Sequence, residues 1–171
     1  MDTTIISGSE EVAQRLYEAE SQKVVKKYTL IATAAGIVPV PVVSIAGVIA
    51  AQVFMVKELA QQFNIPFDEN QVRVMINSAI GGALSKAFSM TLDAVIPGSR
   101  LGGLDLSSAA ISGIYTATVG EFYKVHFQHG GTLENASISD LGKYFMEEIQ
   151  RGDIGLSSIT NPSIFMKSLV S

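Results

Sequence analysis

Apolar and polar residues alternate along this chain at helical rather than strand spacing. The first predicted helix begins near Ser9, a favourable N-cap that Glu10 and Glu11 follow in the first turn. Val12, Leu16, Ala19 and Val24 recur on this helix, which is amphipathic as far as Lys27. The segment that follows Lys27, residues 28–56, contains no charged residue.

The uncharged segment 28–56 is longer than the ~20 residues that a membrane-spanning helix needs. Pro39 and Pro41 lie in its middle, where proline breaks a helix. The segment is therefore one broken span or two short apolar helices that form a hairpin. The residues expected around its turn are Ile37, Val38, Pro39, Val40, Pro41, Val42 and Val43.

The lengths of the two apolar arms bear on this choice. Residues 28–38 and 42–56 would reach only about 16 and 22 Å as helices, so neither crosses a ~30 Å hydrocarbon core. A hairpin would place Lys57 on the same side as the lysines that precede residue 28. A single kinked span would place them on opposite sides.

The rest of the chain also predicts helices. Asp68 is expected to cap one of them, with Gln71 placed to close a capping box, and Gly130-Gly131 to end another. The expected ranges are about 42–63, 68–94, 106–129 and 139–151, with a short last helix from Asn161. We therefore expect an all-α fold, a bundle of about five to six helices without strands.

The chain is expected to form a single helical domain over residues 1–171. Within it, residues 1–22 hold the start of the amphipathic helix, 23–131 the central part and 132–171 the C-terminal helices. Small residues recur at four-residue spacing, which lets helix backbones approach closely. These helix-packing positions are Gly47, Ala51, Ala79, Gly82, Ala83, Ala87, Ala109, Gly113, Ala117 and Gly120.

The composition of the chain is unusually apolar. Only 16% of the residues are charged, against ~25% in ordinary soluble domains, and the mean hydropathy is +0.32. A chain this apolar hides surface in lipid, in an oligomer or in both. The net charge of −4 argues against a nucleic-acid partner. No signal peptide is expected, because the N-terminal residues lack a basic region followed by an apolar one.

Little in the sequence points to catalysis or to a cofactor. The motifs of nucleotide-binding loops, hydrolases and metalloproteases do not occur, so we expect neither an enzyme nor a cofactor or metal site. His126 and His129 share a helix face, and Glu121 or Glu134 could complete a metal site; stacking on neighbouring aromatic rings is the simpler interpretation. Lys23, Lys26 and Lys27 could meet anionic lipid headgroups or form an ordinary solvated face.

The order and spacing of several stretches resemble a known family. These stretches are Lys27 through Pro41, Gln52 with Met55, Ser78 through Gly82, Ile96-Pro97-Gly98, Tyr115 through Gly120, and His129-Gly130-Gly131. Together they are similar to the YcjF-like bacterial family of unknown function, whose members often occur beside or fused to a GTPase domain. The resemblance implies that any GTPase would be a separate chain.

These features lead to two functional hypotheses. The first is a non-enzymatic, self-assembling helical protein at the cytoplasmic side of the bacterial inner membrane, where it works with a separate GTPase or as a scaffold or pore component. Its partners would be membrane lipid, further copies of itself and the GTPase. The alternative is a soluble cytoplasmic adaptor or oligomer, in which the apolar hairpin forms the protein's own core or a subunit interface.

Overall fold

The computed structural model describes residues 3–37, 41–81 and 106–151. Within these ranges every element is a helix, which confirms the all-α prediction. The helices are α1 (Thr3–Gly36), α2 (Pro41–Gln62), α3 (Glu69–Gly81), α5 (Leu106–Gln128) and α6 (Ile138–Arg151). The predicted last helix from Asn161 lies outside the described residues.

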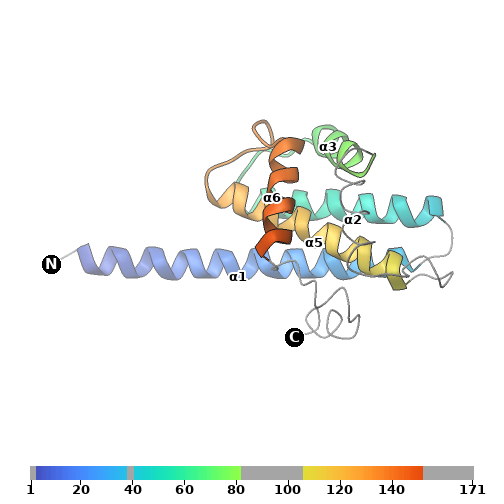
Figure 1. Ribbon diagram of the computed structural model, residues 1–171. Helices are drawn as coiled ribbons and strands as arrows, with labels where there is room; N and C mark the ends of the chain where they lie inside the picture. Colours follow the sequence, from blue (N-terminus) through green and yellow to red (C-terminus); the bar gives the residue numbers. More distant parts are fainter. Residues whose placement is uncertain (1–2, 38–40, 82–105, 152–171) are drawn as a thin grey trace.

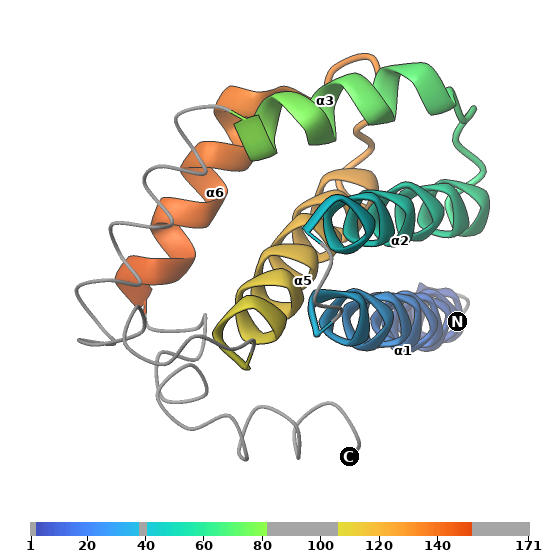
Figure 2. The same ribbon diagram turned by 90° about the vertical axis from the view of Figure 1, so that its right-hand side faces the viewer.

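Three helices form the centre of the bundle. Helices α1 and α2 lie side by side in opposite directions, and α5 packs against both (Figure 1). Helix α3 packs on α2, and α6 packs on α5 and α3, so these two helices cover one side of the centre (Figure 2). The N-terminal half of α1 extends beyond the other helices (Figure 1).

Helix α1 differs from the predicted first helix. It begins at Thr3 instead of near Ser9, and it continues through Lys27 to Gly36 without a break. The change from amphipathic to apolar sequence at Lys27 does not interrupt the helix. It alters which residues face water, however, and no proline interrupts the backbone hydrogen bonds before residue 37.

The start of α3 confirms one half of the predicted capping box and corrects the other. The Asp68 Oδ1 atom accepts a hydrogen bond from the Gln71 backbone N–H at 3.0 Å, as an N-cap does. The Gln71 side chain does not return to the cap. Its amide instead donates to the carbonyl oxygen of Leu133 at 2.9 Å, which ties α3 to the segment before α6.

Helix α5 ends at the predicted glycine pair. Gly130 has a φ of +80°, a left-handed conformation that glycine adopts without a steric penalty. The Gly131 N–H donates to the His126 carbonyl at 2.8 Å, and the Gly130 N–H donates to Phe127 at 3.0 Å. This pattern of bonds is a Schellman motif, which satisfies the carbonyls at the end of the helix.

The core lies where α2, α3, α5 and α6 meet, and Val24 and Val25 of α1 complete it. Its largest fully buried side chains are Tyr123, Phe145, Met55, Leu59 and Leu141. Gly120 lies in this core at the place where α5 meets both other central helices. A Cβ atom there would lie 2.8 Å from Met55 Sδ and 2.8 Å from Val25 Cγ1, so the backbone of α5 packs directly on its neighbours.

We expect Gly120→Val to lower the free energy of unfolding by about 1–3 kcal/mol, because the added atoms overpack the contact with Val25 and Met55. Urea unfolding measures the change. Gly142→Ala in α6 is the matched control, since nothing lies within 4 Å of its added Cβ. Alanine at that helical position should raise the stability by up to about 1 kcal/mol. A similar loss in both variants would contradict the close packing.

Candidate functional site

Helices α1 and α2 form an antiparallel hairpin that contains the whole uncharged segment. Near the turn, a Cβ added at Gly47 would lie 3.0 Å from the Cβ of Ala35. At the other end of the hairpin, Lys27, which precedes the uncharged segment, meets Glu58, which follows it: the Lys27 Nζ atom lies 2.7 Å from Glu58 Oε2. Both ends of the uncharged segment therefore meet at one end of the hairpin. Of the two forms that the sequence allowed, the structure has the hairpin and not the single kinked span.

The predicted turn residues are partly described. Ile37 follows the last residue of α1, and Pro41 is the first residue of α2, a position where proline does not interrupt helical hydrogen bonds. The side chains of Ile37 and Val43 are more than half exposed. Val38, Pro39, Val40 and the surroundings of the Pro41 and Val42 side chains lie outside the described part of the chain.

The hairpin exposes six large apolar side chains, which together we call its outer face. Helix α1 contributes Leu30, Ile31 and Ile37, and helix α2 contributes Val43, Ile45 and Phe54. The exposed fractions of these six residues run from 41% for Leu30 to 55% for Val43 and Phe54. Scattered exposed apolar residues are normal on a soluble protein, but a set gathered on one uncharged hairpin marks a surface that meets another apolar phase.

The interior of the hairpin is more polar than its exterior. Gln52 of α2 is fully buried and donates to Thr116 Oγ1 of α5 at 3.1 Å. Thr33 of α1 is also buried and donates to the Thr29 carbonyl at 2.8 Å. The buried Thr29 Oγ1 and Gln52 Oε1 atoms make no hydrogen bond with the described residues. The hairpin thus buries a few polar side chains among apolar ones, whereas its large exposed side chains are apolar.

The base of the hairpin carries the first charges. Glu58 Oε2 accepts hydrogen bonds from Lys27 Nζ at 2.7 Å and from the Tyr28 hydroxyl at 2.9 Å. Burial raises the pKa of the Glu58 carboxyl, but the hydrogen bonds from Lys27 and Tyr28 outweigh that effect and hold the pKa below its usual range. The neighbouring Lys57 Nζ lies 5.9 Å from the centre of the Phe67 ring. These groups mark the boundary between the uncharged hairpin and the charged bundle.

The three lysines proposed for headgroup contact lie at this boundary. Lys23 and Lys27 are exposed on α1 and form ion pairs with Glu20 at 2.8 Å and with Glu58, respectively. Lys26 is half-buried and makes no ion pair with the described residues. The exposed pairs are worth little in water, ~0–1 kcal/mol each, so these cations remain available to anionic lipid.

The small-residue positions lie at helix contacts where they are described. Ala51 belongs to a small buried cluster with Ala32 and Val48, and Ala79 is fully buried in α3. Gly113 is buried in α5, and Ala117 is half-buried. Gly82, Ala83, Ala87 and the surroundings of the Ala109 side chain lie outside the described residues.

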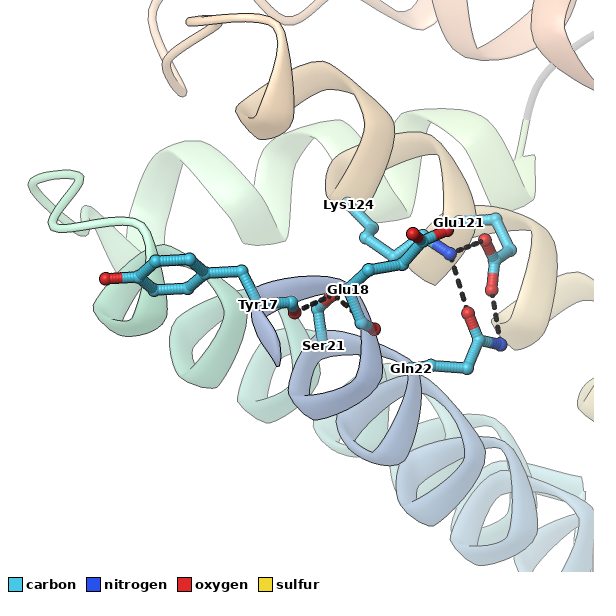
Figure 3. A network of polar contacts seen from close by, with 6 residues as sticks. All are labelled: Tyr17, Glu18, Ser21, Gln22, Glu121 and Lys124. Atoms are coloured by element: carbon cyan, nitrogen blue, oxygen red, sulfur yellow. Dashed lines mark hydrogen bonds and ion pairs between the residues drawn. The ribbon is translucent and has the colours of Figure 1, made fainter. Parts of the chain in front are cut away.

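A polar network links α1 to α5 on the water side of the boundary (Figure 3). The Gln22 amide donates to Glu121 Oε1 at 2.8 Å, and Lys124 Nζ donates to Gln22 Oε1 at 2.6 Å. Lys124 also forms an ion pair with Glu121, and its side chain is only 9% exposed. The sequence suggested Glu121 as a possible metal ligand beside His126 and His129, and it did not suggest a pair with Lys124. Their three-residue spacing could have indicated the ion pair, but nothing local indicated Gln22.

The histidines take part in structural contacts. The His126 Nε2 atom lies 2.8 Å from Asn135 Oδ1 and 3.0 Å from the Thr132 carbonyl oxygen, and its ring stacks on Phe122. His129 Nδ1 lies 2.7 Å from the Val125 carbonyl oxygen. Among the described residues, no group of three His, Cys, Asp or Glu side chains could hold a metal ion.

By length and composition, one helical stretch within the described ranges is apolar enough to cross a membrane. It is Val43–Gln62, and 44% of its most apolar 18-residue window is buried inside the protein. Much of this helix therefore packs against α1, α3 and α5. The part that reaches outward belongs to the outer face of the hairpin.

Comparison with known proteins gives one relative. The chain is similar to magnetosome membrane protein 22 of Magnetospirillum gryphiswaldense, with 32% identity over 138 residues, which cover 77% of this chain and 70% of the relative. No family model matches the chain, and no solved structure matches it. The resemblance to the YcjF-like family stays a prediction, because this relative has no bearing on it.

We expect Glu121→Gln to lower the free energy of unfolding by about 1–3 kcal/mol, because it leaves the mostly buried Lys124 ammonium without its carboxylate. The same substitution should cost several-fold less in a Lys124→Met background, where no cation is left to pair. A double-mutant cycle by urea unfolding measures this coupling. Additive effects of the two substitutions would contradict a network that acts as one unit.

The lowered pKa of Glu58 gives a second expectation. A carboxyl whose pKa is lowered by folding stabilises the folded state at pH values above its pKa in the unfolded chain, which is about 4.3. This stabilisation is lost as the pH falls through the pKa in the folded state. Lys27→Met should raise the Glu58 pKa, measured by carbon-detected NMR titration, because it removes a hydrogen bond to the carboxylate. Lys57→Met is the matched control and should leave that pKa unchanged, since Lys57 lies over Phe67. Equal shifts in both variants would contradict the assignment.

Proposed function

The chain belongs to the family of magnetosome membrane protein 22, and from that premise we propose that it is a non-enzymatic membrane protein whose α1–α2 hairpin enters one leaflet of a lipid bilayer. The name of its relative supports a membrane location. The single observation that carries the proposal is the apolar, uncharged and solvent-exposed outer face of the hairpin, together with the polar groups inside it.

The free energy of transferring these exposed apolar side chains from water to lipid favours insertion of the hairpin into a bilayer. Complete burial of a Leu, Ile, Val or Phe side chain stabilises by about 1.5–3 kcal/mol. The six outer-face residues Leu30, Ile31, Ile37, Val43, Ile45 and Phe54 are each exposed by roughly half. Moving them into lipid therefore contributes roughly 4.5–9 kcal/mol. Within the two helices the backbone hydrogen bonds are made internally, so only the groups at the turn need other partners.

The dimensions of the hairpin match one leaflet. Residues 28–37 of α1 rise by about 15 Å and residues 41–56 of α2 by about 24 Å, whereas half of a ~30 Å hydrocarbon core is about 15 Å. A tilted hairpin with its turn near the bilayer centre therefore places Lys27 and Lys57 among the headgroups. Each lysine near an anionic surface contributes about 1 kcal/mol. The N-terminal half of α1 lies at the opposite end from the turn and would stay in water (Figure 1).

The finer parts of the function are also proposals. The protein would sit on the cytoplasmic side of the bacterial inner membrane and assemble with further copies of itself. A GTPase in a separate chain, implied by the YcjF-like resemblance, would dock on the water-side helices, and the assembly would act as a scaffold or pore component. The alternative soluble adaptor would need a cover for the outer face, and no described helix supplies one.

We expect Ile37→Glu and Ile45→Glu each to weaken vesicle binding by tenfold or more, because a charged side chain within a membrane helix costs about 2.5–3.5 kcal/mol. Both residues are exposed, so their replacement should leave the fold intact. Flotation with vesicles of phosphatidylglycerol and phosphatidylethanolamine measures binding.

Val74→Glu is the matched control for this experiment. Val74 is 65% exposed on α3, outside the hairpin, and its replacement should not change flotation. If the unaltered protein stays at the bottom of the gradient with every lipid mixture, the proposed membrane function is wrong. The proposed function is also wrong if the Ile37→Glu and Ile45→Glu proteins float with the same yield as the Val74→Glu protein.

A further inference from the structure

The outward face of α1 carries a regular row of exposed residues along almost its whole length. Leu16, Lys23, Leu30 and Ile37 follow at intervals of seven residues. Val12 precedes them on the same face, and Ala34 lies there between Leu30 and Ile37. Seven-residue spacing of this kind forms a seam to which a second helix can pack. No described helix covers it, and every residue from 8 to 20 is exposed.

This seam is symmetric about Lys23. Leu16 stands seven residues before Lys23 and Leu30 seven after it, and Val12 and Ala34 stand eleven before and after it. A two-fold axis at Lys23 would place each residue of one antiparallel helix opposite its mirror position in a second copy. Leu16 would then meet the second copy's Leu30, and Val12 would meet its Ala34. Ile37, at the end of the seam, would lie opposite Ser9.

The charges on α1 favour the same antiparallel arrangement. Residues 8–22 hold four glutamates and one arginine, a net charge of −3, whereas residues 23–37 hold three lysines, a net charge of +3. Antiparallel pairing places each acidic half beside the basic half of the other copy, with Glu20 opposite Lys26. Parallel pairing would instead place like charges together, which is unfavourable.

We propose that in water a second copy of this chain packs antiparallel on the outward face of α1, centred on Lys23, and that a membrane releases it. The paired segment, residues 9–37, is about 42 Å long. It includes Leu30 and Ile37, which belong to the outer face of the hairpin, so pairing shields part of the surface that enters lipid. This last step rests on the proposed function, whereas the antiparallel pair itself does not.

Single cysteines test the pair directly, because the chain has no cysteine of its own. In water, Lys23→Cys should form a disulfide with itself upon mild oxidation, since the axis places the two copies of residue 23 opposite each other. Leu16→Cys alone should cross-link several-fold less, and so should Leu30→Cys alone. An equal mixture of the Leu16→Cys and Leu30→Cys proteins should restore the yield. All three positions are exposed, so the variants should fold.

Charge reversal gives a second readout of the same pair. Glu20→Lys should lower the Leu16–Leu30 cross-linking yield several-fold, because it faces Lys26 of the second copy. Adding Lys26→Glu to the same chain should restore the yield. Efficient self-cross-linking of Leu16→Cys would indicate a parallel pair and overturn the proposal, and so would a yield that does not depend on the position of the cysteine.

Vesicles of phosphatidylglycerol and phosphatidylethanolamine separate this proposal from the proposed function. Loss of the Leu16–Leu30 cross-link when the protein floats with vesicles supports both. Flotation without any cross-link in water overturns the pair and leaves the membrane function standing. A cross-link in water without flotation at any lipid composition supports the pair and overturns the membrane function. A cross-link that persists in the floated protein overturns release by the membrane.

Discussion

The antiparallel contact between α1 and α2 is the constraint on which the rest of this structure depends. An uncharged segment interrupted by prolines folds back on itself, and the close approach of Gly47 to Ala35 brings its arms together near the turn. The ion pair of Lys27 with Glu58 closes the other end. Because both boundaries meet at one end, every residue between them belongs to one uncharged hairpin, and α5 packs along it (Figure 1).

The distribution of polarity in the hairpin follows from this contact. Side chains that face α5 find hydrogen-bond partners there, as Gln52 does with Thr116, while the outward side chains remain apolar. On the water side of Lys27 the pattern changes, and Gln22, Glu121 and Lys124 join α1 to α5 through polar contacts. One long helix thus combines a charged segment with an uncharged one, and the change occurs within about one turn of α1.

Much of the fold followed from local signals, and the differences have physical causes. Gly130 ends α5 as predicted, because a left-handed residue after a helix favours glycine. The start of α1 was misplaced, since a good capping residue such as Ser9 does not prevent helix from forming before it. The second partner of Gln71 and the Gln22 network could not be predicted, because they depend on residues distant in sequence. Hairpin and single span have the same local pattern, so only tertiary contacts distinguish them.

The depth that individual residues reach in a bilayer tests most directly whether the α1–α2 hairpin enters one leaflet. Single cysteines placed in turn from Lys23 to Ile37 and from Val43 to Gln61, each carrying a fluorescent label, can be quenched by lipids that hold a quencher at known depths. A hairpin inserted in one leaflet should place the labels at Ile37 and Val43 deepest in the bilayer and the labels at Lys27 and Lys57 at the level of the headgroups. Labels at Lys27 and Lys57 in opposite leaflets, or no residue deeper than the headgroups, would contradict it.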